Sequence, residues 1–177
     1  MKLIVAFCKN RGIGLNNKMP WYLKSDLKRF KKLTIGKGNN AIIMGRNTWI
    51  SLKCLSLPKR SNIILSSKMG YFQTNDKAFM QSFEDIKMVN QSKLYDDIWL
   101  IGGAQVYNEA LSRNLVNEVY ATVINEDFEC DTFFPVLSDD FAIVDKSEIY
   151  NEKNINFNYI HYKKLKPYIS NLVEKTK

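Results

Sequence analysis

Histidine and cysteine are scarce in this sequence: its 177 residues include one histidine, His161, and three cysteines. A single imidazole excludes a multi-histidine metal centre, and a serine–histidine–aspartate triad would have to use His161 itself. Cys8, Cys54 and Cys130 are odd in number and widely spaced, unlike the paired framework of a small secreted domain. We therefore expect no metal centre, no disulfide scaffold and a reducing compartment.

Long hydrophobic runs are also missing. The first apolar run, residues 3–8, ends at Lys9 and is too short for the core of a signal peptide. No stretch approaches the roughly 20 apolar residues that a membrane-spanning helix needs. These absences predict a soluble, cytoplasmic protein with no targeting segment. Hydrophobic residues nevertheless make up 45% of the chain and aromatic residues 12%, which suits one ordered domain and excludes wholesale disorder.

Acidic residues are almost absent from the first 75 positions, where Asp26 is the only one. The net charge of the chain is +8, and much of it falls in two blocks. Residues 18–37 hold seven lysines and arginines against Asp26, and residues 161–177 hold five lysines against Glu174. Such blocks are typical of proteins that bind nucleic acid, an anionic membrane surface or an anionic small molecule, and composition alone leaves all three open.

The apolar residues predict an α/β fold. Five short runs rich in isoleucine, valine and leucine have the length of strands buried on both faces, as in a parallel sheet. They are residues 3–8, 41–44, 62–65, 98–101 and 119–124. Residues 155–159 alternate between apolar and polar side chains, which predicts a half-exposed strand at the sheet edge. We expect residues 1–165 to form one domain, with a mostly parallel central sheet and an antiparallel C-terminal edge strand, and residues 166–177 to form a basic tail.

Helical patterns fall between these strands. After Ser25, a candidate N-cap, apolar residues recur on one helical face at Leu27, Phe30 and Leu33. Ser82 and Asp85 have the spacing of a capping box, and short helices are expected at residues 48–52 and 104–111. Strands that alternate with helices predict right-handed crossovers and helices flanking the sheet.

Two junctions between a predicted strand and a predicted helix carry residues suited to an anionic ligand. The first reads Gly45, Arg46, Asn47 and Thr48. Unpaired N–H groups at a helix start and a neighbouring arginine suit phosphate groups. The second, at Gly102 and Gly103, lacks the full glycine pattern of a dinucleotide-binding fold, yet it allows a ligand to approach the backbone closely. Each junction taken alone fits an ordinary turn at least as well.

Asp26 stands beside the apolar face of the first predicted helix. The loop before it is rich in glycine and asparagine, ends in Met19, Pro20 and Trp21, and has the composition of a mobile segment. The acid is either a first-turn residue favoured by the helix dipole or a ligand-binding carboxylate in an apolar pocket. In isolation the dipole explanation is the better one.

Six motifs follow one another within a resemblance that runs from about residue 3 to about residue 162: IVAFCKNRGIG, MPW with Asp26 five residues after it, IIMGRNTW, LPKRSNIILS, IGGAQVY and DTFFP. In this order and at this spacing they resemble the dihydrofolate reductase family. The resemblance implies NADPH-dependent reduction of 7,8-dihydrofolate to tetrahydrofolate, which supports one-carbon metabolism and thymidylate synthesis. Hydride would pass from nicotinamide C4 to pterin C6, with protonation at N5.

The resemblance also implies which residues bind and reduce the pterin. Asp26 would hold the 2-amino and ring N–H groups, Thr122 would support Asp26, and Arg60 would bind the α-carboxylate of the glutamate. The remaining substrate-binding positions are Ile4, Val5, Ala6, Leu27, Phe30, Lys31, Leu52 and Ile101. The residues with a catalytic role are Asp26, Met19, Trp21 and Tyr107.

The cofactor-binding positions implied by the resemblance lie mainly in the glycine-containing turns. They are Ala6, Ile13, Gly14, Gly45, Arg46, Asn47, Thr48, Leu65, Ser66, Ser67, Lys68, Ile101, Gly102, Gly103, Ala104, Gln105, Val106 and Tyr107. Gly102 and Gly103 resemble the family's cis Gly–Gly bond. Gln105 and Ser67 stand where several relatives carry basic residues, which leaves the adenosine 2′-phosphate to Arg46, with Lys68 as a substitute.

The resemblance further implies a monomer that binds antifolates such as methotrexate and has no nucleic-acid or membrane partner. Three alternatives remain. A pyrimidine reductase of riboflavin synthesis shares the fold but is not expected to keep Trp21, Asp26 and Arg60 together. A nucleic-acid-binding module would use the lysine-rich helix at residues 28–37, although a solvated lysine face explains the same residues. The third is the reductase half of a fusion with thymidylate synthase.

Overall fold

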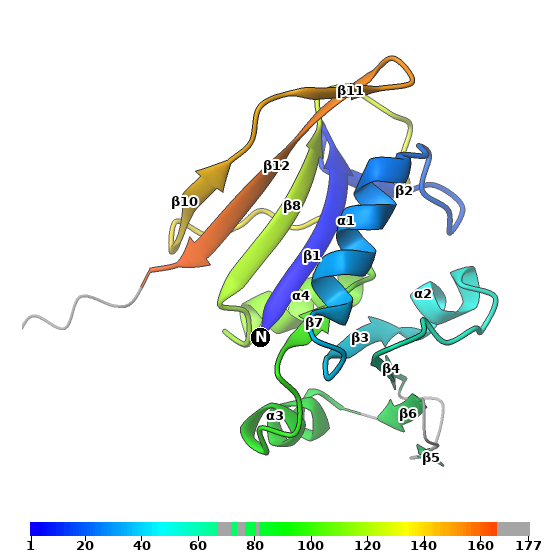
Figure 1. Ribbon diagram of the computed structural model, residues 1–177, viewed down its shortest axis with the longest axis vertical. Helices are drawn as coiled ribbons and strands as arrows, with labels where there is room; N and C mark the ends of the chain where they lie inside the picture. The colour runs from blue at the N-terminus through cyan, green and yellow to red at the C-terminus, as the bar shows by residue number, and fades with distance from the viewer. Residues whose placement is uncertain (67–71, 74–76, 81, 166–177) are drawn as a thin grey trace, which may run out of the picture.

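The computed structural model describes residues 1–66, 72–73, 77–80 and 82–165 (Figure 1). The five apolar runs form strands as predicted: β1 (Lys2–Cys8), β3 (Ala41–Gly45), β4 (Ser61–Leu65), β7 (Ile98–Leu100) and β8 (Glu118–Ile124). Their order in the sheet is β8-β1-β7-β3-β4, and every neighbouring pair is parallel. Ser67, Lys68 and the predicted tail, residues 166–177, lie outside the described residues.

Antiparallel strands extend this sheet at both ends. β12 (Ile155–Lys164) pairs with β8 in the antiparallel direction. The prediction that residues 155–159 form the sheet edge is wrong, because other strands pair with β12 on the side away from β8: β11 (Tyr150–Glu152) with residues 155–157 and β10 (Phe141–Lys146) with residues 160–164. β11 forms a hairpin with the start of β12. At the opposite end β6 (Lys77–Met80) pairs with β4 in the parallel direction, and β5 (Phe72–Gln73) pairs with β6 in the antiparallel direction. The mostly parallel sheet with an antiparallel edge is confirmed.

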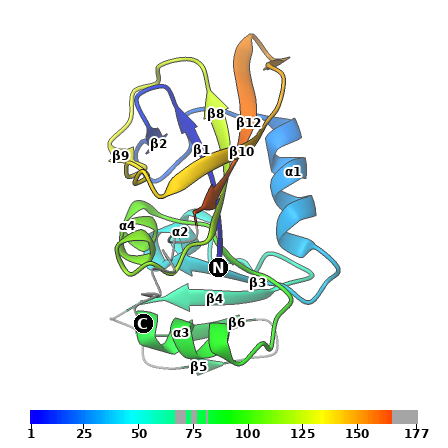
Figure 2. The ribbon, with the colours of Figure 1, turned by 90° about the vertical axis from the view of Figure 1, so that its left-hand side faces the viewer.

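Helices cover both faces of the sheet. α1 (Lys24–Ile35) and α2 (Arg46–Ser51) pack on the face that carries Ile42, whereas α3 (Phe83–Gln91) and α4 (Ala104–Ser112) pack on the face that carries Ile43. Figures 1 and 2 show α1 on one side of the strands and α4 on the other. Because both faces are covered, the strands read as continuous apolar runs instead of alternating ones.

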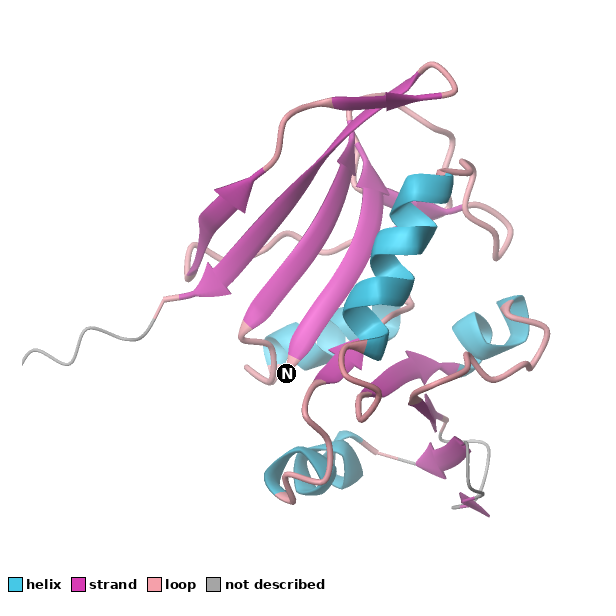
Figure 3. Cartoon of the chain, viewed as in Figure 1, coloured by secondary structure: helices cyan, strands magenta, loops and turns pink. Residues whose placement is uncertain are grey.

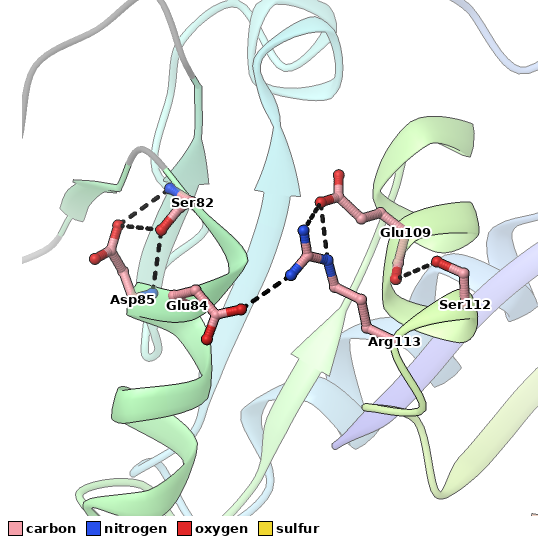
Figure 4. A network of polar contacts seen from close by, with 6 residues as sticks. All are labelled: Ser82, Glu84, Asp85, Glu109, Ser112 and Arg113. Carbon is pink, nitrogen blue, oxygen red and sulfur yellow. Dashed lines mark hydrogen bonds and ion pairs between the residues drawn. The ribbon is translucent and has the colours of Figure 1, made fainter.

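Two helix starts differ in how well the sequence predicted them. Ser25 is not the N-cap of α1, because the helix begins at Lys24 and Leu23 occupies the N-cap position. The capping box of α3 is present: Ser82 Oγ accepts a hydrogen bond from Asp85 N at 3.3 Å, and the Asp85 carboxylate accepts one from Ser82 N at 3.1 Å (Figure 4).

An arginine after α4 ties the two helices of that face together. Arg113 forms ion pairs with Glu84 of α3 at 3.0 Å and with Glu109 of α4 at 2.9 Å (Figure 4). All three side chains are substantially exposed, so the pairs orient the helices more than they stabilise them.

A second, two-stranded sheet holds the loop that follows β1. β2 (Gly12–Gly14) pairs antiparallel with β9 (Thr132–Phe133), so segments more than 100 residues apart in the chain meet here. Cys8 and Cys130 lie beside this sheet as free thiols with their sulfur atoms 3.9 Å apart. Within the described residues, none of the helices has the length and hydropathy needed to cross a membrane.

Candidate active site

A cavity of about 530 Å³ opens beside β1, between α1 and α2. Its walls come from both sheets, from these two helices and from the turn before β4. The lining residues are Ile4, Val5, Ala6, Ile13, Gly14, Asn17, Lys18, Met19, Asp26, Leu27, Phe30, Lys31, Asn47, Thr48, Ser51, Leu52, Leu57, Pro58, Arg60, Ile101, Tyr107, Thr122 and Thr132. Every residue that the sequence assigned to substrate binding is among them.

The acid in this lining is Asp26, and a threonine from the sheet holds it. Asp26 lies in the first turn of α1, and its Oδ1 accepts a hydrogen bond of 2.6 Å from the hydroxyl of Thr122. Thr122 is buried on β8, opposite Ala6 of β1 in the parallel ladder. The ladder thus sets the position of the hydroxyl, and the hydroxyl sets the position of a carboxylate 96 residues earlier in the chain.

Burial raises the pKa of Asp26 above its ordinary value, while the hydrogen bond from Thr122 and the charge of Arg29 oppose the rise. Arg29 lies one helical turn along α1, with its guanidinium 4.2 Å from the ring centre of Tyr159. Asp26 therefore offers two carboxylate oxygens at the edge of an apolar cavity, with one of them already bonded. Such a group suits a ligand that presents paired N–H donors.

Arg60 is the buried cation of the cavity, and the chain around it fixes its guanidinium. Nε donates to the carbonyl of Pro58 at 3.1 Å, and Nη1 donates to the hydroxyl of Thr34 on α1. The guanidinium carbon lies 5.7 Å from the ring centre of Phe30. Burial lowers the pKa of Arg60, but an arginine stays charged at neutral pH. The arrangement leaves a preoriented planar donor for a carboxylate.

Asn62 explains why the turn before β4 holds Arg60 in place. Its side-chain oxygen accepts from Leu57 N at 2.9 Å, and its amide donates to the carbonyls of Leu57 and Arg60 at 3.0 and 2.9 Å. These three bonds close the turn over a buried side chain. The sequence drew attention to Arg60 but not to the asparagine that shapes its loop.

At the far end of the cavity the backbone is open and rich in glycine. The Gly102–Gly103 peptide bond is cis, as the resemblance implied, and Gly45 N donates to Gly102 O at 2.7 Å. A Cβ atom at Gly102, where φ is 118°, would lie 3.2 Å from Tyr107 Oη and 3.6 Å from Thr48 Oγ1. The position therefore requires glycine, because its φ angle is positive and a side chain would crowd Tyr107.

Tyr107 marks where this glycine turn meets β1. Its hydroxyl donates to the carbonyl of Ile4 at 2.8 Å, and burial raises the pKa of Tyr107 far above its ordinary value. The ring is therefore neutral and fixed, and it packs edge-to-face with Phe134. It forms a rigid wall of the cavity and is not a source of protons at neutral pH.

The residues assigned to cofactor binding divide into three groups. Those in the cavity wall are Ala6, Ile13, Gly14, Asn47, Thr48, Ile101 and Tyr107. Those beside the wall, at the ends of β3, β4 and β7 and the starts of α2 and α4, are Gly45, Arg46, Leu65, Ser66, Gly102, Gly103, Ala104, Gln105 and Val106. Ser67 and Lys68 lie outside the described residues. In neither α2 nor α4 does the side chain of the N-cap residue accept a hydrogen bond from the start of the helix, because both N-cap residues are glycine.

Of the residues assigned a catalytic role, Asp26, Met19 and Tyr107 line the cavity, whereas Trp21 does not. The indole of Trp21 is buried in a separate cluster and packs edge-on against Phe128 at 5.3 Å.

Sequence reasoning missed six residues of the wall: Asn17, Lys18, Ser51, Leu57, Pro58 and Thr132. Leu57, Pro58 and Thr132 lie within the six motifs, and the other three lie within two residues of one, so a wider window around each motif finds them. Thr132 reaches the cavity only because β9 pairs with β2, and the DTFFP motif was its single signal.

Comparison with known proteins agrees with this geometry. The chain matches the family model described as "Dihydrofolate reductase" over residues 1–164. It is 36% identical to the dihydrofolate reductase of Aedes albopictus, over 92% of this chain and 96% of that protein. It is 34% identical to that of Rattus norvegicus, over 93% and 97%, and 39% identical to that of Buchnera aphidicola, over 76% and 78%.

The chain therefore belongs to the dihydrofolate reductase family, and it is an oxidoreductase that reduces dihydrofolate. This membership decides between the function classes that the sequence left open. Of the reductases that share this fold, the family matched is dihydrofolate reductase and not the riboflavin-pathway reductase. The lysines of α1 are exposed, opposite a face packed on the sheet, as a solvated helix face requires.

Proposed function

We propose that this chain reduces 7,8-dihydrofolate with NADPH as cofactor and that Asp26 is the residue that holds and polarises the pterin. The observation that carries the proposal is a single, partly buried carboxylate, bonded to Thr122, in a cavity whose other walls are mainly apolar. One oxygen of Asp26 accepts from Thr122, and both oxygens face N–H donors of the 2-amino group and ring of the pterin. The apolar residues of β1 and α1, Ile4 and Phe30 among them, enclose the flat rings and exclude water.

Proton delivery needs no second acid. The pterin must gain a proton at N5, and this proton can arrive by water once Asp26 has polarised the ring. Because burial raises the pKa of Asp26, the Asp26–pterin pair retains its proton to higher pH than a free aspartate would. Turnover should therefore decline on the alkaline side as this pair loses its proton.

The charged tail of dihydrofolate fits the cations at the other end of the cavity. Arg60, held by Thr34 and Pro58, presents its guanidinium to the α-carboxylate of the glutamate. Lys31 lies on the same stretch of wall and adds a second positive charge. An arginine whose guanidinium group is already held in place loses little conformational freedom when it binds a carboxylate.

The glycine turn and the starts of α2 and α4 fit a nicotinamide dinucleotide. The cavity wall next to Gly102, formed by Thr48, Ile101 and Tyr107, offers a surface for a flat ring next to the pterin site. The starts of the two helices, whose N-cap residues are glycines without a capping side chain, suit phosphates, with Arg46 in the first turn of α2. When bound, the nicotinamide supplies the hydride that pterin C6 receives. We assign the preference for a 2′-phosphate to Arg46.

The wider setting follows from the same activity. We propose a cytoplasmic monomer that is inhibited by antifolates such as methotrexate, in which residues 1–165 form the reductase domain and residues 166–177 form a tail. The free thiols of Cys8, Cys54 and Cys130 support a reducing compartment.

Replacing Asp26 with asparagine tests the proposal. Asp26→Asn should bind NADPH with an affinity close to that of the wild type, because the carboxylate lies at the pterin end of the cavity. Turnover of dihydrofolate near neutral pH should fall by about 10²–10⁴, the range typical of lost acid–base assistance. It should recover in part at low pH, where the substrate is already protonated. A rate near that of the wild type at neutral pH would contradict the role of Asp26.

A further inference from the structure

The helix that carries Asp26 has no cap of its own. Its N-cap residue is Leu23, whose side chain cannot accept a hydrogen bond, so the first N–H groups of α1 need partners from elsewhere. Glu152 of β11, 128 residues away, supplies them. Its Oε1 accepts from Lys24 N at 2.6 Å, and its Oε2 accepts from Ser25 N at 3.0 Å and from the Ser25 hydroxyl.

Glu152 is held in place by a tight hairpin. β11 and β12 pair from Tyr150 to Phe157 and are joined by Lys153 and Asn154, both of which have positive φ angles of 54° and 64°. Two such residues form the turn whose twist matches that of the paired strands. Figure 3 shows this hairpin at the same end of the sheet as the first turn of α1.

A second contact joins the hairpin to the segment that leads into α1. Lys153 Nζ lies 4.9 Å from the ring centre of Tyr22. Phe157 of β12, which pairs with Tyr150 of β11, belongs to the same buried cluster as Trp21 and Leu23. The hairpin thus touches the chain before the helix and at its first turn, directly before Asp26 in sequence.

We propose that Glu152 is a positioning residue for the reductase reaction: by capping α1 it holds the turn that presents Asp26 to the pterin. The inference rests on the proposed role of Asp26, and it adds a residue that does not line the cavity. Glu152, which lies outside the cavity wall, binds the backbone at the start of α1, and Thr122, which lines the cavity, binds the carboxylate of Asp26. Two contacts from opposite sides, one on the backbone and one on the side chain, determine where the carboxylate sits.

The charge of Glu152 should affect the pH dependence of turnover, which a purely structural cap would leave unchanged. The groups that face Asp26 are Thr122 from β8, Tyr159 from β12, Arg29 from its own helix and Glu152 from β11. The negative charge of Glu152 raises the pKa of Asp26 and also offsets the positive end of the helix dipole. Removing that charge should therefore lower the pKa of Asp26 and move the alkaline decline in turnover to lower pH.

The experiment compares Glu152→Gln and Glu152→Ala with Glu126→Gln as a matched control. Glu126 carries the same charge near the same hairpin, but its carboxylate accepts a backbone hydrogen bond from Asn156 N of β12, at 3.0 Å, instead of one from α1. Steady-state rates are measured with dihydrofolate and NADPH across pH, together with the KM for NADPH and the melting temperature.

For Glu152→Ala we expect kcat/KM for dihydrofolate at neutral pH to fall about three- to fivefold, the factor that a lost cap of typical strength gives. The KM for NADPH should stay unchanged. Both Glu152 variants should move the alkaline decline to lower pH, and Glu152→Gln, which keeps one acceptor oxygen, should lose less kcat/KM than Glu152→Ala. Glu126→Gln should leave the profile where it is.

Two results would overturn the inference. One is a lower melting temperature in the Glu152 variants with an unchanged pH profile and unchanged kcat/KM, which would make the cap structural only. The other is an equal shift in Glu126→Gln, which would make the effect one of general charge. Failure of the proposed function is separate, because Asp26→Asn would then keep its turnover whatever the Glu152 variants do.

Discussion

Asp26 is placed where it costs the folded protein stability. Burial raises its pKa, so the folded state holds the proton more tightly than the unfolded state does. At a pH above both pKa values the folded protein must keep a desolvated anion, and stability is lower there. Below about 3.9, the pKa of an unfolded aspartate, the residue is protonated in both states and the cost is absent.

Asp26→Asn should therefore be more stable than the wild type at neutral pH, although it is far less active. A gain of about 1 kcal/mol would raise the melting temperature by roughly 2–4 °C in a domain of this size. The difference should shrink as pH falls through the raised pKa of Asp26 and disappear near the unfolded value. Thermal melts of both proteins across pH measure it, and a variant less stable than the wild type at neutral pH would contradict the expected sign.

Single residues of the site were predictable only with help from the family resemblance. Asp26 stood out because no other acid occurs in the first 75 positions, but the residues alone favoured a dipole role. Thr122 and Arg60 had no signal of their own, since both act through partners that are distant in the chain. Asn62, which shapes the Arg60 turn, and Glu152, which caps α1, had no sequence signal for these roles and became visible only from their hydrogen bonds.

At the scale of elements, the sequence predicted helix starts correctly where all the residues that form the cap are close together in the chain. The capping box of α3 needs only Ser82 and Asp85, and the sequence predicted both correctly. The start of α1 was predicted wrongly at Ser25 because its cap comes from β11. The edge position of β12 was wrong because the apolar run at residues 141–144 was not counted among the predicted strands, although it forms β10 and pairs with β12.

Ser82→Ala tests how much one cap contributes. The substitution removes the hydroxyl that accepts a hydrogen bond from Asp85 N. We expect the free energy of unfolding to fall by about 1 kcal/mol and the melting temperature to fall by roughly 2–4 °C. Turnover should not change, because α3 lies across the sheet from α1 and outside the cavity wall. Ser112→Ala, which loses only a bond to the carbonyl of Glu109, is the control and should melt close to the wild type. Equal losses in the two variants would refute the capping role.

At the scale of the whole molecule, the net charge of +8 acquires a partial explanation. The described cavity wall holds Lys18, Lys31 and Arg60 against Asp26 alone, so it attracts an anionic ligand. The other lysines of α1 are exposed, and the basic tail lies outside the described residues, so they have no explanation from the site.

This charge predicts a salt dependence. The Debye length falls from about 30 Å at 0.01 M to about 3 Å at 1 M ionic strength, which screens the exposed lysines from the substrate. The KM for dihydrofolate should therefore rise several-fold over that range. Dihydropteroate, which lacks the glutamate and its two carboxylates, should show a smaller rise. A KM that is independent of salt for both substrates would show that the basic wall plays no part in binding.

The central claim is that this chain reduces dihydrofolate with NADPH at the Asp26 cavity. The most direct test follows absorbance at 340 nm with dihydrofolate and NADPH, with and without methotrexate, and again with NADH in place of NADPH. We expect oxidation that depends on dihydrofolate, that methotrexate abolishes and that is faster with NADPH. The absence of any methotrexate-sensitive oxidation would contradict the account.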